Sequence, residues 1–237
     1  MDLICLASAL SVPLLIGSMP LRMLAGQRND FFFLERMCVA FGLGWGVITL
    51  SMFYMSLAGI QFSPATCTLF SFLFMLAVVL ALKIFNPSRH HGSQQDFSSC
   101  RSPFMNRWSL REILLMIAMI LSMSFLVFDT MLMGNDTWDG WSVWGFKAKI
   151  YFIHKNIPFE LFKNPFGLVW GNWDYPHHVP LMETWGFLWL GYWNDQLSRI
   201  IFPLFHAGLA TCSYAFFRRY SSRFLSLCGA FFILTLP

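Results

Sequence analysis

Acidic side chains at the start of one polar stretch, residues 134–196, could act as a catalytic base. Asp136 and Asp139 follow directly on an apolar run, where a carboxylate is partly shielded from water. A shielded carboxylate is a stronger base than one in bulk solvent and can take a proton from an attacking hydroxyl group. We expect Asp139 to have this role, with Asp136 as the second candidate. The alternative is that both are solvated loop residues, or that one caps the helix that follows.

Basic and aromatic side chains that could bind the reactants come next. Lys147 lies two steps of four residues after Asp139, so a helix over residues 140–154 would place both along one groove. An ammonium group can bind a phosphate as a point charge. The alternative for Lys147 is that it reaches to lipid headgroups at a membrane surface. Trp138, the aromatic residue directly before Asp139, is a further candidate for substrate binding.

A second polar group stands later in the same stretch, on a turn that two prolines hold extended. Its side chains suit hydrogen bonds to sugar hydroxyls or to a phosphate, and contact with lipid headgroups is the alternative. Adjacent histidines point apart and are poor ligands for one metal ion, so we assign no metal ligand. The group consists of Asp174, Tyr175, His177 and His178.

One arginine, Arg199, stands just inside the next apolar run. A charge at that depth is costly unless it has an anionic partner. A bound phosphate would serve, and so would Asp195, which lies four residues earlier. We therefore include Arg199 among the candidate substrate-binding residues and keep the pairing with Asp195 as the alternative.

The composition shows what kind of fold must position these groups. Of the 237 residues, 57% are hydrophobic and only 12% are charged, whereas soluble domains have about 25% charged residues. This composition is typical of a multi-pass membrane protein. The net charge of +4 is small and lies mostly in short connections, so it indicates membrane topology, and we expect no nucleic-acid partner.

Six apolar runs indicate an all-α, multi-pass transmembrane protein, because a helix needs about 20 apolar residues to cross a bilayer. The last run is short because it reaches the end of the sequence. The runs cover residues 3–21, 37–60, 65–85, 113–133, 198–217 and 224–237.

The placement of lysine and arginine predicts the orientation. Arginines gather in the connections 22–36 and 86–112, which we therefore place on the cytoplasmic side. The polar stretch 134–196 then lies on the external side. In this orientation, the stretch that carries the candidate catalytic residues lies outside the membrane.

A seventh apolar run, residues 179–193, is short for a span. If it crossed the membrane, the arginines after residue 217 would lie outside, against the usual bias. We expect it instead to lie flat on the outer surface as an amphipathic helix. Trp185, Trp189 and Trp193 would occupy the interface, and Glu183 would belong to its polar side.

The polar linker suggests that the chain has two units. Residues 1–86 contain three spans, residues 87–112 form a cytoplasmic linker, and residues 113–237 carry the loop and three further spans. A GxxxG pattern at Gly42 and Gly46 is a weak signal for helix packing. Because the last run ends with the sequence itself, we expect a fragment of a longer protein, which alone could lack activity.

The order of motifs in residues 113–237 resembles the N-terminal part of GT-C class glycosyltransferases. These membrane enzymes include the protein O-mannosyltransferases and the lipid A aminoarabinose transferase. In them an acidic motif follows a span, and a surface helix, a K-P-P-L-x-x-W segment, a glycine, an arginine that opens a span, a basic end and an L-T-x-P segment come after it. The matching positions here are Trp138-Asp139, residues 140–154, Val179 to Trp185, Gly191, Arg199, Arg218-Arg219 and Leu234 to Pro237.

This sequence departs from the family pattern in four respects. The acidic motif of the family is often two adjacent acids, but Gly140 follows Asp139 here, and Val179 replaces the lysine before the proline. The first three spans do not match the usual start of the fold, and the later spans of a complete enzyme are missing. The phosphate contact of the missing lysine would pass to His178, Lys147 or Arg199.

The resemblance implies transfer of a sugar from a polyprenyl-phosphate donor to a glycan, lipid or protein acceptor at the external face. Asp139 would be the general base, and Lys147, His178 and Arg199 would stabilise the phosphate that leaves. The expected location is a bacterial cytoplasmic (inner) membrane, where such enzymes build cell-envelope glycans. The donor lipid takes the place of a cofactor, and dependence on a divalent metal stays open.

Two other functions are compatible with a chain of this kind. A transporter or flippase of lipid-linked sugars would need charged residues in the middle of its spans, and the predicted spans have almost none. A non-catalytic membrane assembly protein would use the loop only to bind a partner. Tolerance of alanine at all the acids and bases of the loop would favour this second alternative.

Overall fold

The computed structural model describes the chain except for short segments, and the described part consists of helices and connecting turns. It contains no β-strand, so the all-α class is confirmed for these residues. Five of its helices are long and apolar enough to cross a membrane, which makes the chain an integral membrane protein. The described residues are 1–25, 32–85, 108–133, 137–163 and 175–236.

The six predicted apolar runs all form helices. The first five runs form long helices, and the sixth forms a helix of only 12 residues. The helices end where polar or turn-forming residues replace the apolar run, as a membrane helix requires. Their bounds are α1 Asp2–Ala25, α2 Phe33–Leu57, α3 Pro64–Phe85, α4 Leu110–Met133, α9 Ile201–Tyr220 and α10 Arg223–Leu234.

Short helices form the described parts of the polar stretch. The helix predicted over residues 140–154 is present, but its first turns are π-helical, and a left-handed residue, Lys155 with φ of 51°, ends it. The run at 179–193 is a helix of 13 residues, too short to count as a span. The elements are η2 Gly140–Gly145, α5 Phe146–His154, α6 Phe159–Lys163, α7 His178–Leu190 and α8 Asp195–Ser198.

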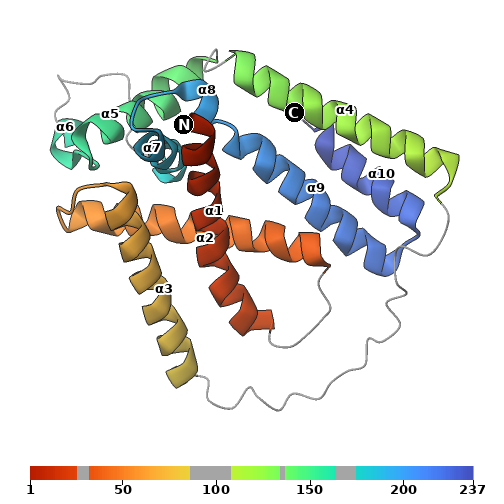
Figure 1. The fold of residues 1–237 in the computed structure, drawn as a ribbon, viewed down its shortest axis with the longest axis horizontal. Helices are drawn as coiled ribbons and strands as arrows, with labels where there is room; N and C mark the ends of the chain where they lie inside the picture. The colour runs from red at the N-terminus through yellow and green to blue at the C-terminus, as the bar shows by residue number, and fades with distance from the viewer. Residues whose placement is uncertain (26–31, 86–107, 134–136, 164–174, 237) are drawn as a thin grey trace.

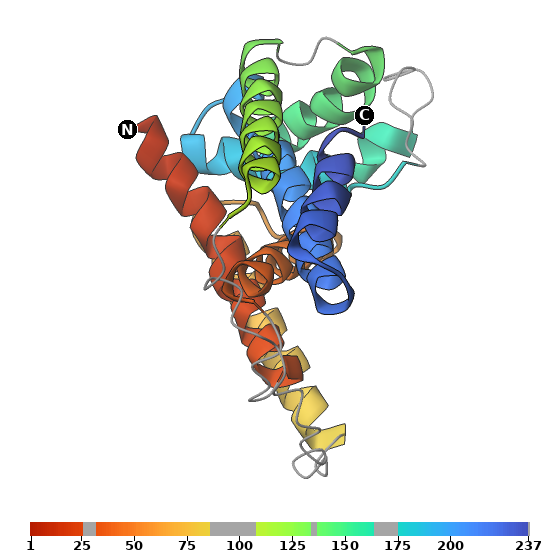
Figure 2. The ribbon, with the colours of Figure 1, turned by 90° about the vertical axis from the view of Figure 1, so that its right-hand side faces the viewer.

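The helices fall into three groups in space. Helices α1, α2 and α3 form one group, and α4, α9 and α10 lie side by side in a second (Figures 1 and 2). Helices α5 to α8 gather at the end of the molecule where α1 begins (Figure 1). Helix α2 also packs on α9, and α7 packs on α1, α2 and α5. The first three helices therefore support the region that carries the candidate site.

Helices α1 and α2 approach each other closely at two glycines. The backbone of Gly17 faces Ala40, and that of Gly44 faces Pro13, so closely that a Cβ atom at either glycine would overlap the opposing carbonyl group. The GxxxG pair at Gly42 and Gly46 does not make this contact: Gly46 has nothing near its missing side chain, and Gly42 meets only a phenylalanine ring. The close contact is made by Gly44, which lies between these two glycines.

Helix α7 is buried, and this corrects the prediction of an amphipathic surface helix. Trp185 has no exposed surface and donates its indole N–H to the carbonyl of Ala9 on α1 at 2.8 Å. Glu183, expected on a polar side, is only 2% exposed. The prediction failed because helix α1 covers the face that the sequence alone assigns to a membrane surface. One hydrophobic core contains residues of α1, α2, α3, α5, α7 and α9.

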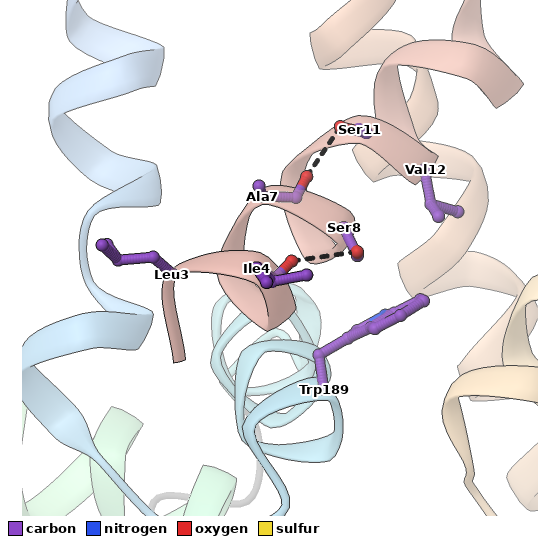
Figure 3. A pocket seen from close by; sticks show the side chains of 7 residues that line it. All are labelled: Leu3, Ile4, Ala7, Ser8, Ser11, Val12 and Trp189. Carbon is purple, nitrogen blue, oxygen red and sulfur yellow. Dashed lines mark hydrogen bonds between the residues drawn. The ribbon is translucent and has the colours of Figure 1, made fainter. Parts of the chain in front are cut away.

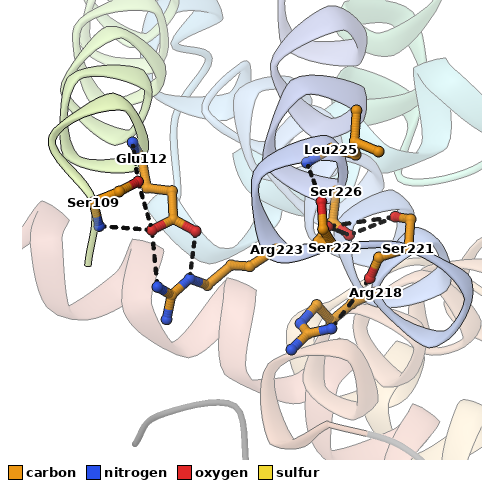
Figure 4. Close-up of polar contacts among 8 residues, drawn as sticks. All are labelled: Ser109, Glu112, Arg218, Ser221, Ser222, Arg223, Leu225 and Ser226. Carbon is orange, nitrogen blue, oxygen red and sulfur yellow. Dashed lines mark hydrogen bonds and ion pairs between the residues drawn. The ribbon is translucent and has the colours of Figure 1, made fainter. Parts of the chain in front are cut away.

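Two ion pairs, each with a buried glutamate, join helix ends that the charge pattern placed on one side of the membrane. Glu35 at the start of α2 pairs with Arg219 at the end of α9 at 2.7 Å. Glu112 at the start of α4 pairs with Arg223 at the start of α10, also at 2.7 Å (Figure 4). Replacing one partner of such a pair leaves the other charge without its partner, which destabilises the protein. They hold these four helix ends together, while their direction across the membrane stays a prediction.

Candidate functional site

The described residues of the polar stretch form a cluster of cationic, aromatic and imidazole groups between α5 and the start of α7. Lys147, on α5, has no exposed surface. Its ammonium nitrogen lies 5.9 Å from the ring centres of Trp144 and Tyr175, and these two rings stack with centres 5.6 Å apart. The rings provide negative faces that a nearby ammonium group favours.

His177 connects this lysine to the rest of the cluster. Its Nδ1 atom lies 2.6 Å from the hydroxyl oxygen of Tyr151, and its ring stacks on Phe53 of helix α2. Burial lowers the pKa of His177, and the positive charge of Lys147 lowers it further. His177 is therefore held in its neutral form, in which one ring nitrogen donates and the other accepts a hydrogen bond.

His178 and Thr184 fix the position of α7. The Nδ1 atom of His178 lies 2.7 Å from the hydroxyl oxygen of Thr49 in the middle of α2. Burial also lowers the pKa of His178. Thr184 donates to the carbonyl of Ala148 on α5 at 3.2 Å. Helix α7 is thus tied to α2 on one side and to α5 on the other, and the cluster has a rigid support.

The π-helical turn before α5 sets which side chains reach the cluster. A π-helical turn has more residues than an α-helical one and often occurs at functional sites. Here Trp141 is 59% exposed, whereas Trp144 and Lys147 turn inward. Trp141 and Trp144 therefore lie on different sides of this helix. The shift leaves Trp138, which is 66% exposed, beside Trp141 at the surface.

Asp139, the expected catalytic base, lies apart from this cluster. It stands at the N-cap position of η2, but its side chain makes no capping hydrogen bond and is exposed to solvent. Within the described residues it has no ion pair or hydrogen bond to the cluster. Lys147 is buried while Asp139 is exposed, so the predicted common groove does not hold both. Asp136 and Asp174 lie outside the described residues.

Arg199 belongs to a different group of charges. It ends the short helix α8, and its charge acts on Glu183 of α7 together with that of Asp195. The ion pair with Asp195, the alternative to a phosphate partner, does not form within 4.0 Å in the described part of the chain. Among the predicted substrate-binding residues, the structure brings together Lys147, Tyr175, His177 and His178, and it leaves Arg199 outside.

The cluster includes residues that the sequence did not assign to the site. Tyr151 follows Lys147 by four residues, a spacing that places both on one side of α5 and that could have revealed it. Thr49 and Phe53 could not be found in this way, because Thr49 and His178 are 129 positions apart. The described histidine, cysteine and acidic residues include no group of three that could hold a metal ion.

Two open grooves lie away from the cluster and share one tryptophan. The first, of about 500 Å³, is lined by residues of α1 and by Trp189 (Figure 3). The second, of about 530 Å³, lies between α3 and the other side of Trp189. Both are mostly apolar, as expected of helix surfaces that face lipid. Trp189 stands eleven positions after His178 on the sequence, so the grooves adjoin the far end of α7.

Comparison of the chain with models of known protein families, with curated proteins and with solved structures finds no match.

Proposed function

We propose that this chain is a membrane glycosyltransferase of the GT-C type, which transfers a sugar from a polyprenyl-phosphate donor to an acceptor at the external face of the membrane. The observation that carries the proposal is the cluster of buried Lys147 with half-buried His177 and exposed Tyr175. A lysine can bind a phosphate, and an adjacent ring can stack on a sugar, so the cluster has the groups that such a donor needs.

The site lies at the end of the spans, which suits a substrate that is half lipid. A polyprenyl chain stays in the bilayer, while its phosphate and sugar stand at the surface. Lys147 would stabilise the negative charge that develops on the departing phosphate, and neutral His177, held by Tyr151, would donate or accept a hydrogen bond there. The acceptor would be a glycan, a lipid or a protein of the cell envelope.

Asp139 stays the proposed general base. A base must come within hydrogen-bond distance of the hydroxyl that it deprotonates, and such distances often shorten only when the substrates are bound. An exposed carboxylate eight positions before Lys147 is available to an acceptor that arrives from solvent. In this arrangement the donor phosphate is bound at the buried cluster and the acceptor approaches from the exposed side.

The proposal is tested by transfer of labelled sugar from a lipid-linked donor in membranes that carry the chain in its longest native form. Lys147→Met removes the ammonium group and keeps an apolar stem of similar length. We expect transfer to fall by roughly 10²–10³-fold, the usual effect of losing one group that stabilises developing charge.

Lys149→Met is the matched control, because Lys149 lies on the same helix but faces Trp193, with its nitrogen 3.8 Å from the ring centre. It should retain most of the transfer. Equal loss in both variants, with both proteins inserted normally, would contradict a specific role for Lys147. Transfer that survives in Lys147→Met would move the phosphate site elsewhere.

A further inference from the structure

A second group of charged side chains lies where α7 meets α8, with one buried and two half-buried members. The proposed transfer chemistry does not use it. Glu183 on α7 is 2% exposed. It shares this region with Asp195 at the start of α8 and Arg199 at its end, whose charges both act on it. Three atoms of this group are buried without a hydrogen-bond partner: Glu183 Oε2, Asp195 Oδ1 and Arg199 Nε.

The charges of this group do not balance when every acid is ionised. Within the group itself, two carboxylates then share one guanidinium group, and the further cation nearby, Lys149, acts on Asp195 and not on Glu183. Burying an unbalanced charge costs several kcal/mol in a low-dielectric interior. One proton removes the imbalance at the least cost, because a protonated carboxyl is neutral and can also donate a hydrogen bond.

The other elements packed around α7 do not supply the missing positive charge to Glu183. On α5, Lys149 acts on Asp195 and lies against the Trp193 ring. Lys147 lies beside the Tyr175 ring, and its charge acts on His177. On α1, Asp2 accepts a hydrogen bond from Tyr192 at 2.8 Å. On α2, Glu35 and Arg36 lie in the first turn, whereas this helix contacts α7 through Thr49. On α3, Lys83 lies in the last turn.

We propose that the cluster of Glu183, Asp195 and Arg199 is a proton-binding site, occupied at neutral pH, whose deprotonation loosens the junction between α7 and α8. The bound proton makes the cluster neutral and lets α7 stay buried. Loss of the proton leaves a charge on the buried Glu183 carboxylate, close to the charge of half-buried Asp195. Because α7 also carries His177 and His178, the change would reach the cationic cluster. The inference does not depend on the proposed transfer activity.

The electrostatics of the folded chain support this assignment. Burial, assisted by the negative charge of Asp195, raises the pKa of Glu183 to about 8 from an ordinary value of 4.5, although Arg199 opposes the change. A carboxyl whose pKa rises on folding stabilises the fold fully below the unfolded value. That stability is lost as the pH rises through the folded value. The free energy of unfolding should therefore decrease as the pH rises from about 5 to above 8.

Infrared spectroscopy of the full chain in lipid vesicles tests the site, because a protonated carboxyl has its own carbonyl absorption. We expect the wild-type chain to show a carboxylic-acid band at pH 6 that disappears with a midpoint near pH 8. Glu183→Gln should lack this band, whereas the control Glu160→Gln, which removes an exposed acid on α6, should keep it. The melting temperature of the wild type should fall between pH 6 and pH 9, whereas that of Glu183→Gln should not.

A band that is absent from the wild type at pH 6, or one that persists in Glu183→Gln, would overturn the proposal. Glutamine has the shape and neutrality of the protonated acid, so this variant should fold. Glu183→Asp provides a second reading if it does not: an ionisable group of different length must change the midpoint or the frequency of the band. An unchanged band in Glu183→Asp would also exclude Glu183 as the proton carrier.

Discussion

Lys147 is the residue on which the proposed chemistry depends most. Its position eight residues after Asp139 placed it on the predicted helix 140–154, and the sequence alone indicated that it could bind a phosphate. The structure adds that it is buried and that it lies beside the rings of Trp144 and Tyr175. Interfacial lysines normally keep the ammonium group in water, and the complete burial of Lys147 is inconsistent with that alternative.

Asp139 is the residue whose role the geometry leaves to experiment. If it is the general base, Asp139→Asn removes the proton acceptor while keeping the shape of the side chain, and transfer of labelled sugar should fall by about 10²–10⁴-fold. Asp129→Asn is the matched control, because Asp129 is also exposed but lies on α4. Unchanged transfer in a normally inserted Asp139→Asn chain would show that the base lies elsewhere, with Asp136 and Asp174 as the next residues to test.

At the scale of the elements, the sequence predicted the long helices well because each is an apolar run of nearly the length that a bilayer requires. It predicted the position of α7 in the sequence correctly, but it placed this helix on the membrane surface and not in the protein interior. The burial of Trp185 depends on Ala9, which lies 176 positions away, and no local pattern encodes such a contact. The same holds for Glu183, which a helical wheel assigns to a polar face and which the fold encloses.

The crossing of α1 and α2 offers a direct test of this packing. Gly44→Ala places a Cβ atom against the carbonyl of Pro13, and because both sides are backbone, neither can move aside cheaply. We expect a loss of about 1–3 kcal/mol or more in the free energy of unfolding. Gly46→Ala, two residues away with nothing near its Cβ position, should be neutral or slightly stabilising. Thermal unfolding in detergent distinguishes them, and equal melting temperatures would contradict the close approach.

At the scale of the whole molecule, one core joins the first three helices to the region that carries the candidate site. The sequence divided the chain at the polar linker, yet α1 and α2 supply the partners of Trp185, His177 and His178. The linker composition shows only that a connection is polar, not whether the segments on either side pack together. The cluster therefore depends on α2 as much as on residues 113–237.

In the proposed function, the donor binds at one end of the molecule, where α2, α5 and α7 meet. The measurement that tests the claim most directly is photo-crosslinking of a polyprenyl-phosphate sugar, with the photoreactive group beside the phosphate, to the chain in native membranes. The account predicts labelled peptides that contain residues 144–151 or 175–178, and loss of that labelling in Lys147→Met but not in Lys149→Met. Labelling confined to the apolar surfaces of α1 and α3, and equal in both variants, would contradict it.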